Sequence, residues 1–163
     1  VFIYSWILIL LTGLLHGFNF MKWNNYTILK TLQENSDSIV YFAESDSNGK
    51  KVILKVSKTS YFAWKIKNEY QILKDVQFPG ISEIIDFSEY NSNPYLAMEF
   101  FDGVSLSLAK PEFLKLSFTH KIQFFIKICE VLIDIHKNKI IHKDIKPSNI
   151  LINFSNQVIR IIA

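Results

Sequence analysis

The sequence predicts an α+β fold, with an antiparallel sheet and one helix in its N-terminal part and the beginning of a helical region after it. Three observations predict this fold class. Apolar runs alternate with polar turns up to residue 101, one segment among them has helical spacing, and a long apolar helix follows. With 163 residues, 49% of them hydrophobic, the chain is long enough to bury a core. The net charge is only +3 and the lysines are scattered, so the sequence indicates no nucleic-acid partner.

Two hairpins begin the predicted sheet. Residues 26–43 consist of two apolar runs on either side of the polar turn 33–38, which is the pattern of a hairpin. The next turn, at residues 45–50, contains an Asn-Gly pair of the kind that favours tight hairpin turns. It leads into a strand at residues 52–56, which carries Lys55 among apolar neighbours.

A helix and two further strands complete the predicted sheet region. Residues 61–76 predict a helix, because apolar side chains recur there every three or four positions. These side chains are Phe62, Ile66, Tyr70 and Leu73. Residues 81–87 and 95–101 predict a strand pair around a turn at residues 91–94.

The helix predicted at residues 119–138, with Ser117 or Thr119 as its cap, is apolar on two faces. One stripe is Ile122, Phe125, Ile126, Cys129, Leu132, Ile133 and His136, and the other is Phe124, Ile128, Val131 and Ile135. Such a helix is usually buried, so we expect further packing partners beyond the given chain and a packed thiol at Cys129. A single cysteine excludes an internal disulfide and fits a reducing compartment.

The most informative motif is His142-x-Asp144-x-Lys146-x-x-Asn149, which occupies eight positions before the apolar residues 150–152. This spacing supplies a carboxylate for a hydroxyl proton, a lysine for phosphate charge and an amide oxygen for a metal ion. His142 is expected to hydrogen-bond the loop rather than to exchange protons.

With this motif the chain resembles a truncated eukaryotic-type protein kinase domain of the serine/threonine type, over residues 24–163. The resemblance implies a complete N-terminal lobe at residues 24–101. It also implies the hinge and only the beginning of the helical C-terminal lobe, with the catalytic loop, at residues 102–163. The implied activity is phosphoryl transfer from ATP, with Mg²⁺, to a serine or threonine hydroxyl of a protein substrate. Asp144 and Lys146 are then the catalytic residues, and Asn149 is the Mg²⁺ ligand.

The same resemblance implies a nucleotide site. Lys55 corresponds to the strand lysine that holds the phosphates, and Glu69 on the following helix corresponds to its partner. Alternatives are an exposed edge lysine at Lys55 and ordinary surface pairs of Glu69 with Lys65 or Lys67.

Three further segments belong to that implied site. Val40 flanks the phosphate-covering loop, and Met98 lies at the back of the adenine pocket. Backbone groups of Glu99 and Phe101 face the base. The alternative for residues 98–101 is a buried strand that simply leaves the sheet.

The phosphate-covering loop departs from the family, since Gln33, Asn35 and Ser38 replace its three glycines. Asn35 tolerates positive φ best among these residues, so it is expected to substitute in part. Glu34 and Asp37 add negative charge near ATP. The loop is therefore either a weak lid, or the nucleotide site has lost affinity.

Two departures concern the C-terminal part. Lys143 replaces an arginine that binds an activation-loop phosphate with a bidentate fork, so activity is expected not to need that phosphate. Counting along the strand at residues 158–162 places Ala163 at, or just before, the position of a metal-binding aspartate. The chain as given is therefore expected to be inactive. The alternatives are a pseudokinase or nucleotide-sensing interaction module, and a decayed reading frame without function.

A narrower resemblance is to the kinase modules that begin very large bacterial multidomain signalling proteins. It is carried by residues 38–41, 78–81 and 142–144.

The apolar leader, residues 1–21, contains no Asp, Glu, Lys or Arg. Three interpretations are open: a membrane anchor, a signal-like segment, and translated sequence upstream of a start at Met21. We expect a cytoplasmic protein, or alternatively a membrane-anchored one with its kinase domain in the cytoplasm. Any membrane contact is expected only through residues 1–20.

Overall fold

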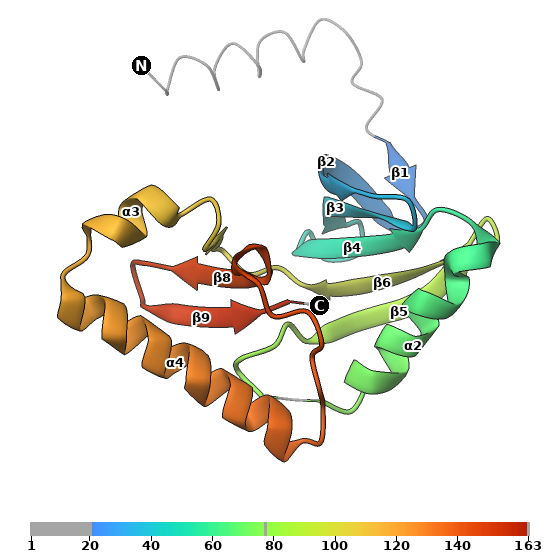
Figure 1. The fold of residues 1–163 in the computed structure, drawn as a ribbon. Coiled ribbons are helices and arrows are strands. Elements are labelled where there is room, and N and C mark those ends of the chain that lie inside the picture. The colour runs from blue at the N-terminus through green and yellow to red at the C-terminus, as the bar shows by residue number, and fades with distance from the viewer. Residues whose placement is uncertain (1–20, 77, 163) are drawn as a thin grey trace, which may run out of the picture.

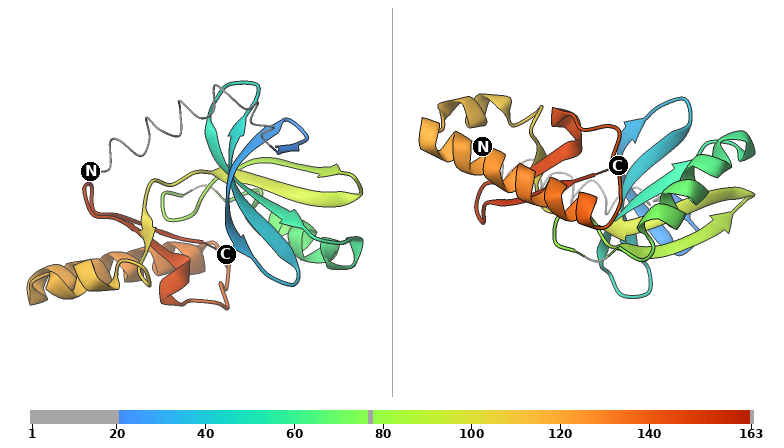
Figure 2. Two further views of the ribbon diagram at one scale, coloured as in Figure 1. Left: turned by 90° about the horizontal axis from the view of Figure 1, so that it is seen from above. Right: turned by 60° about the horizontal axis from the view of Figure 1, so that its bottom comes forward.

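A computed structural model of the chain describes residues 21–76 and 78–162 (Figure 1). It contains a six-stranded antiparallel sheet in the order β1-β2-β3-β4-β6-β5 and a three-stranded sheet in the order β7-β8-β9. The six-stranded sheet and helix α2 form one part, and helix α4 with the smaller sheet forms the other (Figures 1 and 2). The predicted α+β class is confirmed. The predicted leader, apart from Met21, and the prediction on Ala163 lie outside the described residues.

The six-stranded sheet follows the predicted hairpins, with longer strands. Its strands are β1 Lys22–Trp23, β2 Tyr26–Glu34, β3 Ser38–Ser45, β4 Lys51–Ser57, β5 Ile84–Tyr90 and β6 Asn93–Glu99. The turn predicted at residues 33–38 is shorter, because Gln33 and Glu34 still pair with Val40 and Ile39. Strand β1 was not predicted, since two residues are too few to show an alternating pattern.

A partly buried hydrogen-bond network lies at the edge of the core of this sheet. Apolar side chains of β2, β3, β4 and β6 form the core, among them Ile28, Leu54 and Val56. Next to them, Asp86 Oδ2 accepts hydrogen bonds from Tyr26 Oη at 3.2 Å and from Tyr95 Oη at 2.9 Å. Burial raises the pKa of both tyrosines and Asp86 adds to the effect, so both phenols remain protonated donors.

Helix α2, Ala63–Leu73, is preceded by the 3₁₀ turn η1, Ser60–Phe62, and is shorter than the predicted helix at residues 61–76. It packs against β4, β5 and β6 (Figure 1). Ile66 and Leu73 are buried on this face, and the ring of Tyr70 stacks on Phe87 with 4.2 Å between centroids.

The second part consists of a small sheet covered by a long helix. Its elements are β7 Val104–Ser105, α3 Lys110–Lys115, α4 Phe118–Lys137, η2 Pro147–Asn149, β8 Ile150–Asn153 and β9 Val158–Ile161. Ser117 caps α4 by accepting a hydrogen bond from the amide of His120 at 3.3 Å. Phe124, Ile128 and Ile135 of α4 are buried against the apolar side chains of β8 and β9.

The other stripe of α4 is exposed within the described part of the chain. Its exposed members are Ile122, Phe125, Ile126, Cys129, Ile133 and His136, and Leu132 is partly buried. Within the described part of the chain the Cys129 thiol is exposed, so the prediction of a packed thiol is wrong there. The reason is that the stripe with Phe124 and Ile128 covers the β8–β9 hairpin, so Cys129 faces away from it. None of the helices among residues 21–76 and 78–162 is long and apolar enough to cross a bilayer.

The loop between α2 and β5 joins the two parts. Phe78 and Ile81 are partly buried in the core of α4 and the β8–β9 hairpin. Between them, Gly80 accepts a hydrogen bond from the Ile161 amide at 3.0 Å. A Cβ at Gly80 would lie 2.5 Å from Cγ1 of Val131, so only glycine allows this approach.

Replacing Asp86 by Ala is expected to lower the free energy of unfolding by about 1–3 kcal/mol, because two buried phenols lose their shared acceptor. Urea denaturation of the full chain measures this change. The matched control is Glu89→Ala on the same strand, whose exposed side chain predicts a change within about 0.5 kcal/mol. Equal stability of the two variants would show that the network contributes nothing.

Candidate active site

The loop between α4 and β8 brings three predicted residues together. Lys146 Nζ lies 2.7 Å from Asp144 Oδ2. Asn149 Nδ2 donates to Asp144 Oδ2 and to its backbone carbonyl, each at 2.9 Å. The side chains of Asp144 and Lys146 are 58% and 52% exposed, so a second molecule can reach them.

The charge state of Asp144 follows from these contacts. The hydrogen bond from Lys146 holds the pKa of Asp144 below its usual range, and Asn149 and His142 act in the same direction. Asp144 is therefore an ionised carboxylate at neutral pH. Such a group can accept a hydrogen bond from a hydroxyl and orient it.

His142 holds this loop in place, as expected from the sequence. Its Nδ1 accepts a hydrogen bond from the Asp144 amide at 3.3 Å, and its Nε2 lies 3.1 Å from the Ile162 carbonyl. These partners fit one neutral tautomer with the proton on Nε2. Lys143, between the two residues, has φ 64°, in the left-handed region. The imidazole thus connects the loop to the end of β9.

A second group of predicted residues lies between the six-stranded sheet and α2. Lys55 Nζ of β4 lies 2.6 Å from Glu69 Oε2 of α2, and the two side chains are only 18% and 14% exposed. The alternatives of an exposed edge lysine and of surface partners for Glu69 are therefore not what the structure shows. A cavity of about 230 Å³ adjoins the pair. Its lining residues are Asp37, Ser38, Lys55, Phe62, Lys65, Ile66 and Glu69.

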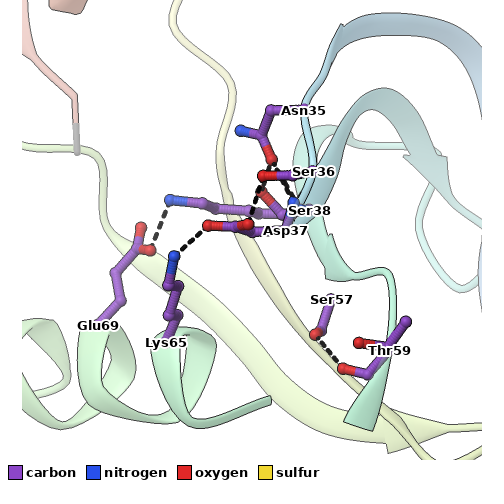
Figure 3. Close-up of polar contacts among 9 residues, drawn as sticks. Asn35, Ser36, Asp37, Ser38, Ser57, Thr59, Lys65 and Glu69 are labelled. Atoms are coloured by element: carbon purple, nitrogen blue, oxygen red, sulfur yellow. Dashed lines mark hydrogen bonds and ion pairs between the residues drawn. The ribbon is translucent and has the colours of Figure 1, made fainter. Parts of the chain in front are cut away.

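The loop between β2 and β3, which covers this cavity, is closed by a side chain (Figure 3). Asn35 Oδ1 accepts hydrogen bonds from the amides of Asp37 at 2.9 Å and Ser38 at 2.8 Å. The expectation that Asn35 replaces a glycine through positive φ is wrong, since its φ is not positive. Asn35 instead shapes the turn with its amide group, a common property of asparagine.

The negative charge of this loop is neutralised within the protein. Asp37 forms an ion pair with Lys65 of α2, and Glu34 Oε1 lies 2.6 Å from Lys58 Nζ. Figure 3 shows the carboxylate of Asp37 between the loop and the helix, with Lys65 and Glu69 side by side on α2. The hydrogen bond from Lys65 lowers the pKa of Asp37. The loop is therefore tied to α2.

The remaining predicted residues are not among those that line the cavity beside Lys55. Val40 of β3 is directly opposite Lys55 of β4 in the sheet register. Met98 and Glu99 are the last two residues of β6, and Phe101 follows it. One contact here was not predicted: Arg160 of β9 forms an ion pair with Glu99. The signal in the sequence is that Arg160 is its only arginine.

Comparisons with known proteins show the family of the chain. The family model described as "Protein kinase domain" matches residues 26–162. The chain is 32% identical over 137 residues to the probable serine/threonine-protein kinase glkA of Dictyostelium discoideum, covering 82% of this chain and 28% of that protein. It is 27% identical over 138 residues to the serine/threonine-protein kinase PrkC of Bacillus subtilis, covering 82% and 21%. It thus spans less than a third of these curated relatives.

A solved structure shares the fold. The kinase domain of Mycobacterium tuberculosis PknI superposes with a TM-score of 0.67 at 19% sequence identity. The match covers 88% of this chain and 60% of that one.

Replacing Lys146 by Met is expected to raise the pKa of Asp144 toward the usual value of about 3.9, because its main hydrogen-bond donor is lost. Since the folded pKa is lowered, the pair favours the folded state above pH about 4, and this effect is lost as the pH falls through the folded pKa. NMR titration of the Asp144 carboxyl carbon measures the change.

Lys143→Met is the matched control, since it removes a charge next to Asp144 and leaves Lys146 in place. Lys143→Met should raise the pKa of Asp144 less than Lys146→Met does. An Asp144 titration that is the same in the wild type and in Lys146→Met would contradict the proposed contact.

Proposed function

The chain belongs to the protein kinase domain family, and we propose that it is the ATP-binding part of a serine/threonine protein kinase. The reaction is the transfer of the γ-phosphoryl group of Mg-ATP to a serine or threonine hydroxyl of a protein. The observation that carries the proposal is the partly buried ion pair of Lys55 and Glu69. It holds an ammonium group beside the cavity under the β2–β3 loop.

The residues present fit Mg-ATP at both ends of the site. Lys55 would hold the phosphates, because Glu69 fixes the position of its ammonium group. Asn149 would ligate Mg²⁺ through Oδ1, since its Nδ2 is already committed to Asp144. When bound, Mg-ATP supplies the phosphoryl group and a divalent cation that offsets its charge.

The catalytic loop supports the transfer step. Asp144 accepts a hydrogen bond from the acceptor hydroxyl and orients its oxygen, because the carboxylate is ionised and exposed. Lys146, whose Nζ forms an ion pair with the same carboxylate, provides positive charge for the phosphoryl group during its transfer. His142 keeps the Asp144 amide in position. Relatives named serine/threonine kinases support a protein substrate. We place the reaction in the cytoplasm, where ATP is supplied.

One observation favours a second function, that of a nucleotide-sensing interaction module without transfer activity. The amides of Asp37 and Ser38 donate to Asn35, so they bind phosphate only if this turn opens. Asp37 also pairs with Lys65, so this ammonium group is already occupied by a carboxylate. Both features weaken the contribution of the loop to phosphate binding.

Titrating the full chain with ATP, with and without Mg²⁺, is expected to show a magnesium-dependent rise in the melting temperature. Lys55→Met should weaken ATP binding roughly tenfold or more, because charge-assisted hydrogen bonds contribute about 1.5–3 kcal/mol. Lys51→Met, on the same strand with an exposed side chain, is the control and should bind as the wild type does.

A shift that depends on Mg²⁺ supports the kinase. A weak or absent shift that does not change with Mg²⁺ supports the interaction module. If the wild type gives no shift, or if Lys55→Met binds ATP as well as the wild type, the nucleotide site proposed here does not exist.

A further inference from the structure

Arg160 is the only arginine in a sequence that holds 18 lysines and arginines together. It lies on β9, and its side chain is only 15% exposed. A guanidinium differs from an ammonium in two ways: it is a planar fork with several fixed donors, and its face stacks on aromatic rings. Arg160 uses one nitrogen, Nη1, for an ion pair and also lies near an aromatic ring.

Both contacts reach from β9 to the segment that follows β6. Nη1 of Arg160 forms an ion pair with Oε2 of Glu99, the last residue of β6. Its Cζ lies 5.1 Å from the ring centroid of Phe101, within cation–π range. One guanidinium therefore holds two residues that stand two positions apart in the same segment.

The β8–β9 hairpin also holds the rest of this segment. Asn153 Nδ2 donates to the carbonyl of Asp102 at 2.6 Å. Val104 pairs with Ile152 in the β7–β8 ladder. Gly103 lies between these two residues, and a Cβ there would lie 2.4 Å from Cε1 of Phe101 and 3.0 Å from the Ile152 carbonyl oxygen, so a larger residue would displace the Phe101 ring. Residues 99–104 are thus shaped by the hairpin and are not a free linker.

We propose that Arg160 is a positioning residue for the base of the nucleotide. It fixes the Glu99 carboxylate and the Phe101 ring, and through them the backbone of residues 99–101, which under the proposed kinase function would face the adenine, as the resemblance implies. This inference rests on that function and deepens it. Arg160 acts on the purine end of the ligand, whereas Lys55 acts on the phosphates.

The two ends of the ligand give different expectations for two variants. Loss of Arg160 should weaken the binding of adenosine and of Mg-ATP by the same factor, because both ligands carry the base. Loss of Lys55 should weaken Mg-ATP only, because adenosine has no phosphate. A merely structural role of Arg160 would change the unfolding midpoint without this pattern.

Calorimetric titration of the full chain with adenosine and with Mg-ATP tests the proposal. Arg160→Met should lower the affinity for both ligands about three- to tenfold, since it removes a partly exposed ion pair and a cation–π contact. The affinity of Arg160→Lys should lie between those of this variant and the wild type, because an ammonium can pair with Glu99 but does not reproduce the contact of the guanidinium with the Phe101 ring.

Lys127→Met is the matched control. Lys127 Nζ donates to the carbonyl of Gln157 at 2.8 Å, in the turn of the same hairpin and away from residues 99–104. Its loss should leave both affinities unchanged. Glu99→Gln provides a second variant if Arg160→Met does not fold, because it keeps the side-chain shape and removes only the ion pair. Glu99→Gln should lower the affinity for both ligands by the same factor, and by less than Arg160→Met does.

Two outcomes overturn the inference in different ways. In the first, the wild type binds both ligands, and Arg160→Lys and Glu99→Gln bind adenosine as tightly as the wild type does. Only the role proposed for Arg160 is then wrong. If the wild type binds neither adenosine nor Mg-ATP, the inference falls together with the proposed function.

Discussion

The ion pair of Lys55 and Glu69 is the interaction on which the candidate site depends. The Lys55 side chain is only 18% exposed, so its ammonium group needs a partner close to the sheet. Glu69 provides such a partner, and removing it would take a carboxylate away from a partly buried ammonium group. The pair also fixes how α2 approaches β4. The position of α2 in turn brings Lys65 to Asp37, so the β2–β3 loop is held by the same helix.

Much of the fold could be predicted, because apolar periodicity specifies which side chains are buried. Helix α4 and the strand pairs were found in this way. The errors occurred where pairing or packing decides. The turn between β2 and β3 is shorter than its polar sequence indicates, because Gln33 and Glu34 extend the ladder. Cys129 lies on an apolar stripe, but periodicity cannot tell which of two apolar stripes is covered by the described elements.

The candidate site, like the fold, could be predicted only in part. The resemblance named Lys55, Glu69, Asp144, Lys146 and Asn149, and the structure brings them together in two groups. Their catalytic roles stay predictions, as does the narrower resemblance to large signalling proteins. Contacts between distant residues could not be predicted: Glu99 and Arg160 are 61 positions apart. The turn made by Asn35 was predictable in principle, since asparagine often accepts from amides two and three residues on.

The central claim is that ATP phosphates lie against Lys55 and Lys146, and chemical labelling tests it most directly. A reactive acyl phosphate of ATP acylates lysines near the bound phosphates, and peptide mapping locates them. The account predicts labelling of Lys55 and Lys146 that excess Mg-ATP suppresses, although the Lys55 side chain is only 18% exposed. Labelling that follows the exposure of the side chains would contradict it. In that case Lys137, which is 71% exposed, is modified first, Lys55 stays unmodified, and Mg-ATP has no effect.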